Sequence, residues 1–380
     1  MRFPEFSGEW ETKSINDLAD VIGGGTPDTT VKSYWDGGIQ WFTPSEIGKN
    51  KFVDASLRTI TEDGLNNSSA KLLPPNTILL SSRATIGECS LSLRECATNQ
   101  GFQSLVSKNC NVDFLYYLIQ TKKKDLIRKS CGSTFLEISA NEVRKIQVSV
   151  PSDVEQQKIA ELLSLIDKRI ATQNKIIEKY ESLIKGLNNI LLYATGGKSV
   201  CLGDILLERS ERSRTNNQHE VLSSTVKGIF SQREYFSKDI ASENNVGYKI
   251  IRLHDVVLSP QNLWMGNINY NDRFEIGIVS PSYKVFSIAD GYDNQFVAAM
   301  LKTHRALYSY MMVSEQGASI VRRNLNMEAF SQLVFKIPSL DKQREIGCAI
   351  SLLKSQLKTA NKIIRAYTSQ KQYLLCQMFI

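Results

Sequence analysis

Two glycine-rich stretches have the residue types that could cradle a phosphate group. Gly23-Gly24-Gly25 follows a short apolar run, as in a dinucleotide site, but Pro27 intervenes and position 28 is Asp where glycine is required. Gly196-Gly197-Lys198-Ser199 has the end of a P-loop, yet Leu192 occupies the place of its first glycine. We therefore expect a tight turn with positive φ at the first stretch and a helix end at the second, with no cofactor bound at either.

The sequence contains no motif for a metal site or for a catalytic nucleophile. The three histidines, at positions 219, 254 and 304, lie at neither helical nor finger spacing from one another or from a cysteine, so no metal site is predicted. No Ser/His/Asp set is assembled by any motif, and Pro74-Pro75-Asn76 has the wrong order for an amino-methyltransferase signature. The seven scattered cysteines form no C-x-x-C pair, which predicts reduced, mostly buried thiols. We expect no catalytic residue, no metal and no cofactor in this chain.

Composition indicates an ordinary globular protein with a basic excess. Of 380 residues, 42% are hydrophobic and 22% charged. The formal net charge of +7 permits contact with a polyanion and does not require it. No apolar run approaches the roughly 18 residues of a membrane span, and the first ten residues lack the apolar stretch of a signal peptide. The prediction is a cytoplasmic protein without a membrane.

The helical elements that must position any site are visible as an internal repeat. Residues 151–193 align without a gap with residues 338–380, and 14 of the 43 positions are identical. Apolar residues in both copies recur at alternating steps of four and three, which is the seam of a coiled coil. Lys371 is the one charged residue in the second seam. Two such seams most simply pair with each other, although two amphipathic helices in separate cores would give a similar pattern. The residues expected to pair are Ile166, Ile170, Ile177, Tyr180, Ile184 and Leu187 in the first copy, and Leu353, Leu357, Ile364, Tyr367 and Leu374 in the second.

Short apolar runs broken by Gly, Pro and Asn precede each long helix. They lie at residues 78–80, 104–106, 256–258 and 283–286, and with a few amphipathic segments they predict α+β units that otherwise share little sequence. The expected fold is α+β, with two globular heads separated by two long antiparallel coiled-coil helices in a pseudo-twofold tandem repeat. The expected domains are a first head at 1–150, a central helix at 151–197, a second head at 198–337 and a C-terminal helix at 338–380.

Polar loops and basic clusters are the candidate contacts with a nucleic acid. Basic residues gather at 122–124, at Arg209, Arg212 and Arg214, and at Arg322-Arg323. Each is either a solvated face or a phosphate contact. Base reading instead needs side chains with paired donors and acceptors on exposed loops. Corresponding loops of the two heads carry Ser82, Arg83 and Thr85, and Gln261, Asn262 and Trp264; the stretch with Asn99 and Gln100 is a further candidate in the first head, and ordinary turn chemistry is the alternative for any one of them.

The sequence resembles the specificity (S) subunits of type I restriction-modification enzymes over nearly its whole length. In the first head the resemblance is carried by IGGGTP (22–27), WFT (41–43), SSRATIG (81–87), ATNQGF (97–102) and GSTFLEIS (132–139), followed by the start of the long helix at 150–167. The second head lacks GGTP and ATNQGF and keeps a VSPSY segment ending at Tyr283. Divergence of this kind is expected if the heads read different sequences.

The resemblance implies a DNA-recognition subunit without catalysis of its own. Each head would be a target-recognition domain for one half of a split, asymmetric site in double-stranded DNA, and Tyr283, Arg322 and Arg323 join the candidate contacts. The helices would act as a spacer and dock two methyltransferase (M) subunits, and the resemblance allows for two restriction (R) subunits. Adenosylmethionine and ATP with Mg²⁺ would bind those partners. The alternative is a coiled-coil scaffold or regulator of the same fold that reads no DNA; a self-sufficient nuclease or methyltransferase is disfavoured by the missing motifs.

Overall fold

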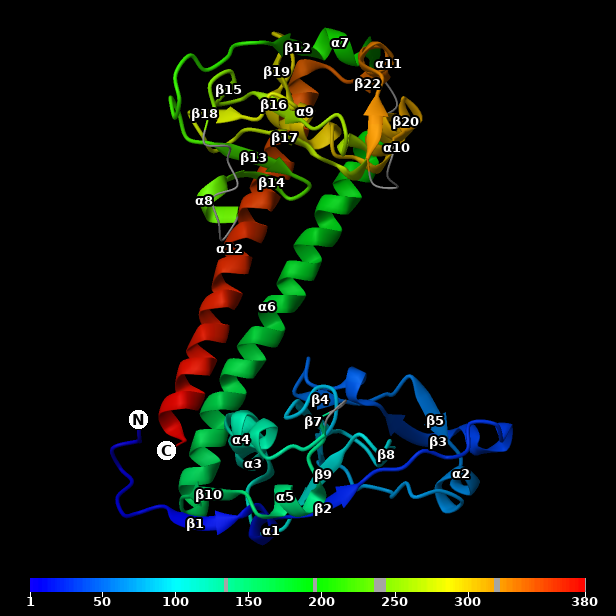
Figure 1. Ribbon diagram of the computed structural model, residues 1–380, viewed down its shortest axis with the longest axis vertical. Coiled ribbons are helices and arrows are strands. Elements are labelled where there is room, and N and C mark those ends of the chain that lie inside the picture. The colour runs from blue at the N-terminus through cyan, green and yellow to red at the C-terminus, as the bar shows by residue number, and fades with distance from the viewer. Residues whose placement is uncertain (133–135, 194–196, 236–243, 318–321, 380) are drawn as a thin grey trace. The chain divides into compact units, whose positions relative to one another are not determined.

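The computed structural model describes residues 1–379 except 133–135, 194–196, 236–243 and 318–321. The chain forms two compact units (Figure 1). The first comprises Met1–Asn174 with Lys362–Ile380, and the second Lys175–Asn361. Each long helix is therefore shared between the two units, and the predicted boundaries of heads and spacers remain predictions.

The first unit is built on a five-stranded sheet of order β2-β9-β6-β7-β4, with a three-stranded sheet β5-β3-β8 and the antiparallel pair β1-β10. Its strands are β1 (Glu11–Ser14), β2 (Ala19–Gly23), β3 (Trp35–Phe42), β4 (Phe52–Val53), β5 (Arg58–Ile60), β6 (Ile78–Leu80), β7 (Cys89–Ser92), β8 (Cys96–Thr98), β9 (Gln103–Ser107) and β10 (Gln147–Val150). Its helices are α1 (Ile15–Leu18), η1 (Lys32–Tyr34), η2 (Pro44–Glu46), α2 (Glu62–Asn66), α3 (Val112–Thr121), α4 (Lys123–Arg128), α5 (Ala140–Arg144) and the first part of α6 (Asp153–Tyr193).

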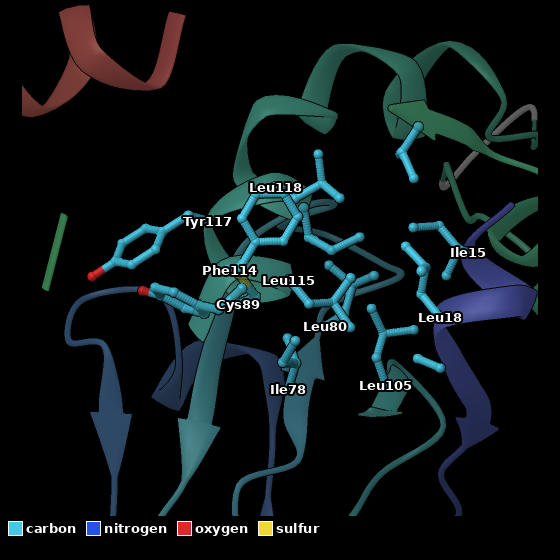
Figure 2. Packing of buried hydrophobic residues seen from close by; sticks show 14 of the residues in the cluster. Ile15, Leu18, Ile78, Leu80, Cys89, Leu105, Phe114, Leu115, Tyr117 and Leu118 are labelled. Atoms are coloured by element: carbon cyan, nitrogen blue, oxygen red, sulfur yellow. The ribbon is translucent and has the colours of Figure 1, made fainter. Parts of the chain in front are cut away.

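The core of this unit packs α3 against the five-stranded sheet. Phe114, Leu115 and Leu118 of α3 lie among Leu80 and Leu105 of strands β6 and β9 (Figure 2). The same apolar cluster includes residues from the start of α6 and the end of α12 (Leu340–Met378). Burying each such side chain is worth about 1.5–3 kcal/mol, so head and helices share one stabilising core.

The second unit has a four-stranded sheet of order β12-β19-β16-β17, with the antiparallel pairs β11-β22, β13-β14, β15-β18 and β20-β21. Its strands are β11 (Lys198–Cys201), β12 (Leu206–Arg209), β13 (Leu222–Thr225), β14 (Gly228–Ser231), β15 (Lys249–Arg252), β16 (Val256–Leu258), β17 (Ile268–Tyr270), β18 (Ile276–Val279), β19 (Lys284–Ile288), β20 (Ser314–Gln316), β21 (Arg323–Leu325) and β22 (Val334–Ile337). Its helices are α7 (Leu202–Ile205), α8 (Gln232–Tyr235), η3 (Leu263–Met265), α9 (Asn294–Met300), α10 (His304–Met312), α11 (Met327–Ser331) and the first part of α12.

The two heads share more than their sequences suggested. The order β2-β9-β6-β7 in the first is matched by β12-β19-β16-β17 in the second, with antiparallel pairing throughout both sets. The heads therefore repeat in topology although they share little sequence, in keeping with the predicted pseudo-twofold repeat. Strand pairing depends on backbone hydrogen bonds and alternating burial, so it survives changes of side-chain identity.

Two equivalent glutamines attach the long helices to the heads. Gln156 donates from Nε2 to the Pro151 carbonyl at 3.0 Å and accepts from the backbone N–H of Asn111, which caps α3, at 3.0 Å. Gln343 makes the same two bonds in the second unit: it donates to Pro338 at 2.9 Å and accepts at 3.0 Å from Asp293, which caps α9. Both glutamines are buried. The repeat therefore includes the hydrogen bonds between each helix and its head as well as the helix itself.

The long helices α6 and α12 pack together and run antiparallel where they meet in the first unit. Asp167 bonds to Lys371 at 2.7 Å, and two residues later Arg169 lies over the ring of Tyr367, which is four residues earlier in α12. All eleven residues expected to pair are buried or half-buried, whereas most positions between them are exposed. No helix among the described residues is long and apolar enough to cross a membrane.

The cysteines differ from expectation. Cys89 and Cys96 are buried, but Cys131, Cys348 and Cys376 are exposed. The prediction that most of the thiols are buried is therefore wrong. Two of the exposed residues lie on the outer face of α12, where the coiled-coil pattern leaves any small side chain in solvent. Burial raises the pKa of the Cys89 thiol to about 12, which keeps it protonated.

Candidate nucleic-acid interface

Separate sequence motifs of the first head converge on the loop that follows β6. Ser81 at the end of that strand bridges to Phe102 of the ATNQGF stretch. The backbone N–H of Ser82 donates to the Gly101 carbonyl at 2.8 Å, and its carbonyl accepts from Ile138, in the GSTFLEIS stretch, at 3.1 Å. Three segments far apart in the chain are therefore held together by backbone bonds that any sequence could make.

The GGGTP stretch packs against this same cluster. A Cβ at Gly24 would lie 2.0 Å from the Asn99 carbonyl oxygen, and a Cβ at Gly25 would lie 2.3 Å from the Ala70 nitrogen. Neither glycine has a positive φ. The expected left-handed turn is therefore wrong: glycine is needed here because two chain segments approach too closely for a side chain. The hydroxyl of Thr26 donates to Gln100, which joins the two motifs.

Arg83 stands at the tip of a constrained loop. Ala84 has φ 55°, uncommon for a residue with a side chain, and Gly87 has φ 84°. Nε of Arg83 forms an ion pair with Oε1 of Glu137 at 2.8 Å, and the two residues also form a β-bridge. Among the described residues the guanidinium has no other partner, so its two Nη groups can still donate. That is the fork that binds guanine O6 and N7.

The other candidates in the first head divide by exposure. Thr85 and Gln100 are exposed, and Asn99 is half-buried with its Oδ1 accepting from the Gly101 N–H at 2.9 Å. Ser82 is fully buried, so its side chain supports the loop and does not reach the surface. The structure therefore brings Arg83, Thr85, Asn99 and Gln100 into one cluster with free polar groups at its surface.

In the second head the loop after β16 lies beside the strand that carries Arg323. The backbone N–H of Arg323 donates to the Gln261 carbonyl at 3.1 Å, which places the two predicted sites together. The Gln261 side chain is exposed, whereas Asn262 and Trp264 are half-buried. Arg322 is exposed and Arg323 is half-buried.

Two of the predicted DNA contacts in this head instead form hydrogen bonds within the head. The guanidinium of Arg323 donates to the Ser314 hydroxyl at 3.0 Å and to its carbonyl at 2.7 Å. The hydroxyl of Tyr283 donates to the Ser224 carbonyl at 3.0 Å, and burial raises its pKa. These groups connect segments within the head, whereas the side chains of Gln261 and Arg322 are exposed.

The basic clusters are partly neutralised by neighbouring acids. Arg209 bonds to Asp255 at 3.0 Å and to Glu211 at 3.2 Å, and Lys123 pairs with Glu88. Arg214 is exposed. A cluster of positive residues in sequence is thus a poor guide to positive surface, because neighbouring acidic residues supply the opposite charge.

Sequence reasoning missed two groups in the first head. Glu137 orients Arg83; it lies in the GSTFLEIS stretch, which was noted only as a motif. Arg58 stacks over the Trp35 ring with 3.5 Å between its Cζ and the ring centroid. Nothing in local sequence pairs them, since β3 and β5 are brought together only by the sheet.

Comparison with known proteins relates this part of the chain to DNA-specificity domains. Residues 7–182 match the family described as the type I restriction modification DNA specificity domain. The chain is 40% identical over 179 residues to the type I restriction enzyme MjaIX specificity subunit of Methanocaldococcus jannaschii, covering 45% of this chain and 41% of that protein. It is 32% identical over 168 residues to the EcoR124I/EcoR124II specificity subunit of Escherichia coli, covering 42% and 41%.

Solved structures extend the likeness in fold to the whole chain. The S subunit of a type I restriction-modification system from M. genitalium matches with a TM-score of 0.62 and 16% identity, covering 100% of this chain and 99% of the other. A chain from a study of assembly and conformational transition of the type I system matches with a TM-score of 0.55 and 13% identity, covering 98% of both. The predicted resemblance and fold class are confirmed, while the sequence matches span about two-fifths of the curated relatives.

Proposed function

We propose that this chain is the DNA-specificity subunit of a type I restriction-modification complex, in which each head reads one half of a split, asymmetric site in double-stranded DNA. It carries out no catalysis itself. The observation that supports this most strongly is the convergence of the first-head motifs on a constrained loop whose arginine keeps two donors free. A loop held by backbone bonds on all sides presents that fork in a fixed direction, which base reading requires.

The second head supports the proposal by its topology. It repeats the sheet order of the first head while its loops carry different residues. Two copies of one scaffold with different loops suit two different half-sites. The loop after β16, equivalent to that of Arg83, exposes Gln261, and the exposed Arg322 precedes the strand bonded to it, which suits contact with DNA.

The long helices are the proposed docking surface for two M subunits. Leu165 on α6 and Leu352 on α12 occupy equivalent places in the repeat and are 57% and 59% exposed. Ile176 and Ile363 form a second equivalent pair, at 37% and 38% exposed. Equivalent apolar residues left in solvent on both helices suit two copies of the same partner.

Adenosylmethionine and ATP with Mg²⁺ belong, on this proposal, to the M and R partners. Gly24, Gly25 and Gly197 lie too close to neighbouring backbone to leave room for a ligand, and the described residues hold no group of three metal-ligating side chains. The complex would act on DNA in the cytoplasm.

Selection from a random duplex pool tests the proposal. The chain assembled with its M partner is expected to enrich a bipartite motif with a fixed gap, and a variant with Arg83→Ala is expected to lose information in one half only. Enrichment of no motif by the assembled complex would instead favour the non-reading scaffold.

A further inference from the structure

Lys371, the one charged residue of the second seam, has partners on neighbouring elements. Nζ of Lys371 lies 2.7 Å from Oδ1 of Asp167, and the two side chains are only 18% and 16% exposed. At the equivalent places of the repeat stand Ile184 and Lys354, so this half-buried ion pair belongs to the first unit alone. A single polar pair in an apolar seam favours one register, because other registers leave a charge without its partner.

Tyr117 connects this pair to the head. Its ring packs at the edge of the core with the hydroxyl directed away from the apolar cluster (Figure 2). That hydroxyl donates to Oδ2 of Asp167 at 2.7 Å, and Lys371 lies over the ring. Burial and the Asp167 charge raise the pKa of Tyr117, so the donor keeps its proton.

Lys51 completes the network from the sheet side. Its Nζ bonds to Asp113 at 2.7 Å and donates to Ser164 at 2.7 Å and Tyr117 at 3.1 Å, with the side chain 8% exposed. Its carbonyl accepts from Leu91 of β7 at 2.7 Å, which fixes it to the five-stranded sheet. Two positive and two negative groups alternate along the network, so the charges balance.

We infer that this network, which we call the head clamp (Lys51, Asp113, Tyr117, Ser164, Asp167 and Lys371), positions the first recognition head on the helix pair and thereby sets the gap between half-sites. The inference rests on the proposed function. The clamp joins the residue before β4 to α3, α6 and α12 through two ion pairs and two hydrogen bonds. Apolar packing alone would permit sliding along the seam.

A change of helix register would move the head by a definite distance. A slip of seven residues keeps apolar seam positions in contact but moves the partner of Asp167 from Lys371 to Ile364 or Met378. At about 1.5 Å per residue this is roughly 10 Å, or about three base pairs of duplex at 3.4 Å each. The half-buried carboxylate opposes that slip, because an apolar residue cannot pair with it.

The test uses the full complex with its M partner and duplexes in which the two half-sites are separated by the wild-type gap or by about three base pairs more or fewer, the length of the slip. Lys371→Ile, which installs the residue of the equivalent seam position, and Lys51→Met are compared with wild type. Lys342→Met, which breaks an exposed ion pair with Glu345 on the same helix α12, is the matched control. The measured quantity is the ratio of methylation rates at the native gap and at the altered gaps.

We expect the ratio to fall about tenfold in both clamp variants and to stay at the wild-type value in Lys342→Met. A merely structural role would lower all rates together and leave the ratio unchanged, and that result overturns the inference. If wild type methylates no split motif, the proposed function fails instead. Should either variant not fold, Tyr117→Phe, which removes only the hydroxyl, is measured in the same way.

Discussion

Replacing Arg83 by alanine separates DNA reading from stability, because the structure assigns very different sizes to the two effects. The Arg83–Glu137 pair is solvated, with side chains 44% and 37% exposed. Exposed ion pairs contribute about 0–1 kcal/mol to stability. A bidentate contact with guanine is worth about 1–3 kcal/mol, or roughly a 5- to 150-fold change in rate constant at one half-site. Arg83→Ala should therefore reduce recognition far more than it reduces folding.

The assay is the methylation rate of the assembled complex on duplexes that carry the native site or a changed first half-site, with a thermal melt of the same samples. Arg94→Ala is the matched control, since Arg94 also pairs with an acid on the surface of this head, Asp54, at 2.7 Å. We expect Arg83→Ala to lose discrimination in the first half-site only, and Arg94→Ala to lose none. Unchanged discrimination in Arg83→Ala would refute the reasoning, as would an equal loss in both variants.

Three further perturbations follow from particular contacts. Leu165→Lys should remove one of two M subunits in native mass spectrometry, and so should Leu352→Lys; retention of both copies in either variant argues against docking there. Gln343→Ala breaks two buried bonds and should cost about 1–3 kcal/mol of unfolding free energy, read as a lower Tm, while the exposed Gln356→Ala should leave Tm unchanged. Burial, and then Lys354, lower the pKa of Lys302 to about 8 from 10.5, so between these values the unfolded chain binds more protons and stability rises with pH. In thermal melts from pH 8 to 10, the Tm of wild type should rise relative to that of Lys302→Met. A Tm difference that stays constant over this range would contradict the prediction.

The sequence predicted the helices well because their pattern is long and local. A period of seven sustained over forty residues favours paired helices over amphipathic helices in separate cores, and the predicted seam positions are all buried or half-buried. The short apolar runs were also strands: residues 78–80 and 256–258 are β6 and β16. Each run is buried on both faces, which a continuous apolar stretch indicates.

The site was less predictable because its geometry depends on contacts between distant segments. Gly24 and Gly25 were expected to provide positive φ, but they provide room for Asn99 and Ala70, which lie far along the chain. Arg323 had the right chemistry for DNA, yet a neighbouring strand uses its guanidinium. Lys371 was expected only as the one charged residue of the second seam, and the fold shows that it contacts Asp167 and the ring of Tyr117.

Methylation mapping of a host genome tests the central claim most directly. A host carrying the complete system with this chain is expected to show adenine methylation at one split, asymmetric motif, and the same host with Arg83→Ala is expected to show the first half relaxed and the second unchanged. Genomes methylated identically with and without the chain would contradict the account.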